Sequence, residues 1–121
     1  MLNLDFLQKK IYWLLTLIFL VLILIGTLFP VDIITTPDLG SDKHYHFVAF
    51  ALFVMPLTFQ NLKNAFWLLP VAVVLGAIIE VLQPHLGRHG ELDDLYADAV
   101  GALIGVILVA LFKLVKFFKS S

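Results

Sequence analysis

The chain has 121 residues, of which 61% are hydrophobic and only 14% are charged. Soluble domains are roughly half apolar and a quarter charged, so this composition and a mean hydropathy of +1.01 place the chain in the membrane class. The absence of cysteine excludes disulfides, thiolate metal sites and cysteine nucleophiles. A net charge of −1 without a basic patch gives no indication of nucleic-acid binding.

The first apolar segment, residues 11–29, carries no charge. A segment of about 19 residues is long enough to cross a hydrocarbon core of ~30 Å. A cleaved signal peptide is the alternative, but the apolar part is too long for one and Phe29-Pro30 follows in place of a small-residue cleavage site. We therefore predict an uncleaved membrane anchor.

Three further apolar segments follow, at about residues 44–59, 65–83 and 95–112. None shows the alternation of period two that transmembrane strands require, and each suits a helix. No repeat or linker divides the chain. The sequence therefore predicts an all-α protein, an integral membrane four-helix bundle that forms a single domain over residues 1–121.

The basic residues indicate an orientation. If the chain crosses the membrane four times, six lysines lie on one side of it: Lys9, Lys10, Lys63, Lys113, Lys116 and Lys119. The other side receives only Lys43 and Arg88. Because short cytoplasmic loops carry an excess of Lys and Arg, both termini are predicted to lie in the cytoplasm. The expected location is the bacterial cytoplasmic (inner) membrane, crossed several times.

Polar residues gather near the predicted outer ends of the helices. His46, Glu80 and Asp98 each lie about one turn inside a segment, roughly 5 Å below its end at the helical rise per residue. Three helices thus contribute to one layer, and ionisable groups inside a membrane usually have a function. We predict a polar pocket at the outer rim. Its members are Asp42, Lys43, His46, Glu80, Gln83, Arg88, Asp94 and Asp98.

Glycines accompany this layer at helical spacing. Gly101 and Gly105 are four residues apart and share a stripe with Asp98, while Gly76 shares a face with Glu80. Small residues on such a stripe let two helices approach closely. The three glycines are therefore predicted to be packing positions, and the Asp98 side chain is expected to point along the packed face, away from lipid.

Several pocket members also suit simpler roles. Ser41 and Asp42 could cap the second helix and Asp93 or Asp94 the fourth, because acceptors at helix N-termini satisfy free amides. Arg88 could form a structural ion pair with Glu80 or Asp98, which would neutralise a costly buried charge. The sequence leaves these alternatives open.

Metal binding and catalysis receive little support from spacing. His85 and His89 are four apart, but glycines interrupt that stretch, so it does not read as a helical ligand pair. No metal or other cofactor is predicted, with His46, Glu80 and Asp98 as the weak candidates for a divalent cation. The same three residues could act as an acid and a base, yet no catalytic residue is assigned.

An ordered set of motifs runs along the whole chain. It comprises Asp42-Lys43-x-x-His46-Phe47 opening the second helix, Glu80-x-x-Gln83 closing the third, Arg88 in the next loop, Asp94 heading the fourth, and Gly101-x-x-x-Gly105. This set resembles the VanZ-like family of membrane proteins, named for a teicoplanin-resistance protein. The chain departs from the family pattern at Asp98, where asparagine is typical, and so gains a second negative charge after Asp94.

The resemblance implies a small multi-spanning membrane protein, with glycopeptide resistance in the founding member and no known reaction. The leading prediction is a pocket that binds or modulates the headgroup of a membrane lipid or a lipid-linked envelope precursor, with a link to teicoplanin resistance. One alternative is a membrane enzyme that acts on a lipid-linked substrate through Glu80, His46 and Asp98. Another is an assembly subunit that pairs with a membrane protein or with a second copy of the chain. No nucleic-acid partner is expected.

Overall fold

The structure, a computed structural model, describes residues 3–28, 42–86 and 92–120. Four α-helices make up these parts: α1 (Leu4–Leu28), α2 (Asp42–Gln60), α3 (Ala65–Leu82) and α4 (Leu92–Ser120). Two short 3-10 helices flank α3, namely η2 (Leu62–Asn64) and η3 (Gln83–Leu86). No strand occurs in the described ranges. The predicted all-α class is confirmed.

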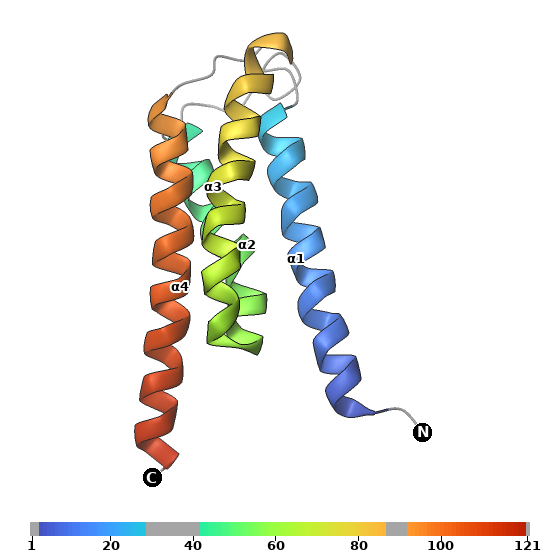
Figure 1. Cartoon of the computed structure of the whole chain (residues 1–121), viewed down its shortest axis with the longest axis vertical. Coiled ribbons are helices and arrows are strands. Elements are labelled where there is room, and N and C mark those ends of the chain that lie inside the picture. Colours follow the sequence, from blue (N-terminus) through green and yellow to red (C-terminus); the bar gives the residue numbers. More distant parts are fainter. Residues whose placement is uncertain (1–2, 29–41, 87–91, 121) are drawn as a thin grey trace.

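The helices run up and down along one long axis (Figure 1). Both termini lie at one end of the molecule, and α1 and α4 extend past the turn that joins α2 to α3. The packing between α2 and α4 is the most extensive of any pair. These two helices are parallel, since the backbones of Phe47 and Ala51 lie against Gly101 and Gly105 in the same order.

The helix ends differ from the predicted ones. The segment predicted at 11–29 is a helix from Leu4, where the Asn3 side chain accepts a hydrogen bond from the Asp5 amide at 3.0 Å. The segment predicted at 95–112 is a helix from Leu92 to Ser120. The apolar run underestimates both helices because Lys and Gln are good helix formers that continue a helix beyond the hydrocarbon. The predictions at 44–59 and 65–83 differ from α2 and α3 by at most two residues at either end.

The prediction of four membrane spans is supported by length and composition for three of the helices, and for α2 it stays a prediction. Among the described residues, three helical stretches are long and apolar enough to cross a membrane: Leu4–Leu28, Leu62–Leu86 and Leu92–Ser120. Helix α2 is not among them, because polar residues occupy its two ends. It is instead the helix that the others cover, and it supplies much of the core with Phe50, Phe53, Val54 and Leu57.

The outer surface of the bundle is apolar and its interior is partly polar. Large hydrophobic side chains on α1, α3 and α4 are exposed, for example Leu14, Val74 and Leu111. By contrast, His46 and Asp98 are buried. Monomeric soluble proteins rarely expose apolar surface on this scale, whereas a lipid environment stabilises it. The chain is therefore a membrane protein.

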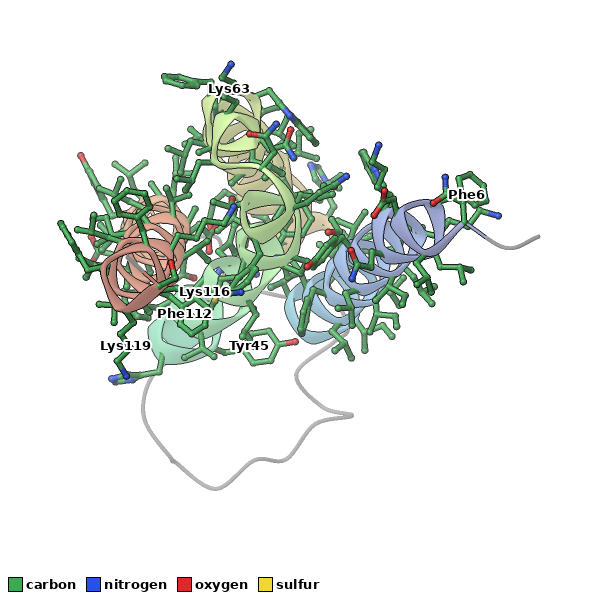
Figure 2. The ribbon with its side chains drawn as sticks, turned by 90° about the horizontal axis from the view of Figure 1, so that it is seen from below. Phe6, Tyr45, Lys63, Phe112, Lys116 and Lys119 are labelled. Carbon is green, nitrogen blue, oxygen red and sulfur yellow. The ribbon has the colours of Figure 1, made fainter. Side chains whose placement is uncertain are left out.

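One end of the bundle has the character of a membrane interface. Six of the seven lysines belong to the α1 start, the α2–α3 turn and the α4 end, and Lys63 and Lys119 project outward there (Figure 2). Aromatic rings accompany them: Trp13 stacks on Trp67 with 6.0 Å between ring centroids. A hollow of about 520 Å³ at this end is lined mainly by aromatic and lysine side chains. Such lysine and aromatic belts are typical of membrane boundaries, and the convergent polar groups lie at the opposite end.

Candidate functional site

The polar layer forms where the first turns of α2 and α4 meet. A hydrogen bond of 2.6 Å joins Nδ1 of His46 to Oδ1 of Asp98. The other imidazole nitrogen, Nε2, lies 3.9 Å from Oδ2 of Asp94. The side chains of His46 and Asp98 are 1% and 0% exposed. A histidine thus lies between two carboxylates inside the bundle.

Helical spacing and close packing place these side chains. Asp94 and Asp98 are four residues apart, so both point from one face of α4 toward α2. Gly101 lies on the same stripe, and a Cβ atom there would collide with the carbonyl oxygen of Phe47. The bare glycine lets the two backbones approach closely. That approach brings His46, the neighbour of Phe47, within hydrogen-bond distance of Asp98.

Helix α3 adds a third carboxylate. Glu80 is half-buried, and one ligand atom each from Glu80, His46 and Asp98 lie within 4.8 Å of one another. One turn away on α3, a Cβ atom on Gly76 would lie only 2.6 Å from Oδ2 of Asp98. Gly76 therefore makes room for this oxygen, which faces α3.

Helix α1 holds the layer from the other side through its backbone carbonyl groups. The Gln83 Nε2 atom donates to the Thr27 carbonyl oxygen at 3.0 Å, which satisfies an acceptor in the last turn of α1. The Tyr45 hydroxyl donates to the Leu22 carbonyl oxygen at 2.6 Å. Its ring reaches from α2 toward α1 (Figure 2), and it lies where a side chain on Gly26 would be.

Several buried polar atoms in the layer lack a hydrogen bond. Among the described residues, no hydrogen-bond partner exists for Nε2 of His46, Oε1 of Gln83 or Oδ2 of Asp98. A buried donor or acceptor without a hydrogen bond costs roughly 1–3 kcal/mol. Three such atoms lie near the same end of the bundle.

The structure brings together four of the eight predicted pocket members, namely His46, Glu80, Asp94 and Asp98. Gln83 is also buried, but its side chain donates its hydrogen bond to α1. The side chains of Asp42 and Lys43, in the first turn of α2, and all of Arg88 lie outside the described residues. The glycines Gly76, Gly101 and Gly105 are all buried at helix contacts. The role of the group as a pocket stays a prediction.

Sequence reasoning missed three residues of the layer: Gly26, Thr27 and Tyr45. Tyr45 precedes His46, and successive helical residues point about 100° apart, so it faces α1 while His46 faces α4. The sequence signal was available in part, since Gly26-Thr27 is a small, polar interruption of a long apolar run. The hydrogen bonds from Gln83 and Tyr45 to α1 could not be predicted, because both are accepted by backbone carbonyl oxygens, which every residue has.

These observations define a helical membrane protein with a buried histidine–carboxylate layer at one end of its bundle. A family model described as VanZ/LLP1 matches residues 7–113. The chain belongs to this family, which confirms the resemblance inferred from its motifs. No curated protein and no solved structure matches the chain.

Proposed function

We propose that this protein binds the polar headgroup of a membrane lipid or a lipid-linked envelope precursor in the layer around His46 and Asp98. The observation that supports this most is the set of buried polar atoms without a hydrogen bond, at the bundle end opposite six of the seven lysines. A headgroup rich in hydroxyl, amide or amine donors would supply the missing partners. The apolar faces of α1, α3 and α4 would meanwhile contact its acyl or polyprenyl chain.

The site faces the outer leaflet in this proposal. Both termini and the turn that carries Lys63 lie at one end of the bundle, and an excess of lysine marks the cytoplasmic side of membrane proteins. The cytoplasmic membrane of a bacterium is then the natural location. A protein that binds envelope precursors there would change how they are displayed, which would link it to glycopeptide (teicoplanin) resistance.

The orientation can be tested cleanly because the chain has no cysteine. We expect a His85→Cys variant in intact cells to react with a membrane-impermeant maleimide. A Ser120→Cys variant is expected to react only after the cells are permeabilised. Both residues are exposed, one in η3 beside the site and the other at the end of α4, so accessibility does not bias the comparison. Labelling of Ser120→Cys alone in intact cells would reverse the proposed orientation.

Headgroup binding can be tested by native mass spectrometry of the protein purified in mild detergent. The probes are phosphatidylethanolamine, phosphatidylglycerol and a polyprenyl pyrophosphate. We expect the wild type to retain one of them and the Asp98→Asn variant to lose at least about tenfold in affinity, since a desolvated charged contact is worth about 2–5 kcal/mol. The matched control is Asp93→Asn, the same change at an exposed position of the same helix.

Equal retention by Asp98→Asn and the wild type would contradict the proposal. The cellular arm measures teicoplanin susceptibility in cells that express either protein. If binding is the basis of resistance, the Asp98→Asn variant confers none, while Asp93→Asn behaves like the wild type.

A second candidate function is catalysis on a lipid-linked substrate. The hydrogen bond between His46 and Asp98 favours it, because a carboxylate that orients an imidazole leaves the second nitrogen available as a general base. Glu80 would be the complementary acid. Turnover of a lipid pyrophosphate by the purified protein, absent in His46→Gln, would decide for this candidate over binding alone.

A further inference from the structure

We propose that the chain holds a divalent transition-metal ion between α2, α3 and α4, with His46, Glu80 and Asp98 as its ligands. One ligand atom from each residue lies within 4.8 Å of those of the other two. The three come from three different helices and are far apart in sequence. In the metal-bound form, the hydrogen bond between His46 and Asp98 would give way to bonds from both side chains to the ion.

The charge of the layer favours a cation. Glu80, Asp94 and Asp98 contribute carboxyl groups, and His46 contributes an imidazole beside them. The lysines whose side chains the structure describes all lie at the opposite end of the bundle. Ionised carboxylates that share a buried site repel one another and lose hydration. A divalent ion offsets both costs, and neutral hydrogen-bond donors offset them less.

The orientation of Asp98 is a second and independent observation. Its Oδ1 atom shares a hydrogen bond with Nδ1 of His46. Its Oδ2 atom faces α3 and has no hydrogen bond in the described part of the chain. Nε2 of His46 also has no hydrogen bond in this part of the chain, and a carboxylate oxygen of Asp94 lies 3.9 Å from it. Both side chains are almost fully buried, so bulk water does not supply the missing partners. Gly76 keeps the space around Oδ2 clear of a side chain.

The ligand types indicate the class of ion. Imidazole nitrogen suits Zn²⁺ and other first-row transition metals, and carboxylate oxygen also suits Mn²⁺. Mg²⁺ and Ca²⁺ prefer sites made of oxygen alone, so the histidine favours Zn²⁺ or Mn²⁺. Three protein ligands leave a coordination position open. The inference rests on the proposed function in one respect: a headgroup phosphate would bind at that open position.

The test is metal binding by the detergent-purified full chain after treatment with a chelator. Zn²⁺, Mn²⁺, Co²⁺ and Mg²⁺ are added separately, and bound metal is measured by elemental mass spectrometry. We expect about one equivalent of Zn²⁺ or Mn²⁺ and little Mg²⁺. The visible spectrum of bound Co²⁺ is expected to show a nitrogen and oxygen ligand field.

The ligand variants are Asp98→Asn, Glu80→Gln and His46→Gln. Each is expected to weaken metal binding at least about tenfold, since even changes behind the ligands cost 10–100-fold. The matched controls Asp93→Asn and His44→Gln alter exposed residues of the same helices and are expected to bind like the wild type. Glu80→Gln decides the matter if a more deeply buried variant does not fold, because Glu80 is only half-buried.

Two outcomes would overturn the metal site. One is a wild-type protein that binds none of the four ions at stoichiometry, and the other is a Glu80→Gln variant that binds as tightly as the wild type. Lipid retention measured on the same preparations separates this inference from the proposed function. Metal bound without any lipid would leave the metal site standing and contradict headgroup binding, whereas lipid retained without metal would do the reverse.

Discussion

Replacing Gly101 with alanine is expected to lower the free energy of unfolding by about 3 kcal/mol, the upper end of the range for overpacking. A Cβ atom at this position meets the carbonyl oxygen, the carbonyl carbon and the Cα atom of Phe47. These are backbone atoms, so no side-chain rotation can relieve the collision and α2 must move away from α4. The intrinsic preference of a helix for alanine over glycine, about 1 kcal/mol, acts in the opposite direction.

The effect is measured by thermal or denaturant unfolding in detergent, with Val100→Ile as the control. That substitution adds a carbon atom in the same turn of α4 on the exposed face, where Val100 is 47% exposed. It is expected to change stability by less than about 0.5 kcal/mol. Since Gly101 lies one turn from Asp98, the alanine variant is also expected to separate the side chains of His46 and Asp98 and so to weaken whatever the site binds. An alanine variant as stable as the wild type would show that α2 and α4 are not held at this point.

The second large effect concerns the pair of His46 and Asp98. Replacing either residue with alanine is expected to cost about 3–5 kcal/mol, because the partner is left buried without its hydrogen bond. The double variant is expected to cost less than the sum of the single ones, with a coupling energy of about 1–3 kcal/mol. The measurement is a double-mutant cycle on chelator-treated protein, so that a bound ion does not contribute to the result.

The control cycle uses His44→Ala and Asp93→Ala. Both side chains are exposed, and exposed substitutions usually change stability by less than about 0.5 kcal/mol. Their coupling energy is expected to be close to zero. Strict additivity of the His46 and Asp98 variants would mean that the 2.6 Å contact contributes no stability to the bundle.

Much of the site could be predicted from helical spacing and depth in the membrane. Glu80 and Asp98 are isolated in apolar runs, and positions counted from the segment ends placed them in one layer with His46. The 1.5 Å rise per residue is constant enough to carry such an estimate over a turn or two. The distances among these residues agree with that shared layer.

The role of α2 could not be predicted in the same way. Its sequence has the length of a span, and hydropathy alone does not tell whether lipid or protein covers an apolar residue. The structure buries Phe50 and Val54 completely, because α1, α3 and α4 all pack on this helix. The contacts to α1 were also invisible, since Tyr45 and Gln83 bind carbonyl oxygens that every residue carries.

The helix ends were underestimated for a related reason. A hydropathy boundary marks where lipid ends, and a helix ends only where its capping and hydrogen bonding end. Lys113 and Lys119 lie beyond the apolar run of α4, yet the helix continues through them to Ser120. Predictions of membrane helices from apolar length alone therefore describe the span and leave out the helical arms beyond it.

The interval of three residues between Asp98 and Gly101 constrains how this chain can change over time. One inserted residue there would rotate everything after it by about 100° around the axis of α4. Either the Asp98 carboxylate would still face His46 while Gly101 and Gly105 turned toward lipid, or the two glycines would still face α2 while the carboxylate turned away from His46. Single substitutions on the outward face of α4 are therefore tolerable, but a change of length within this turn separates the chemistry of the layer from the contact that assembles it.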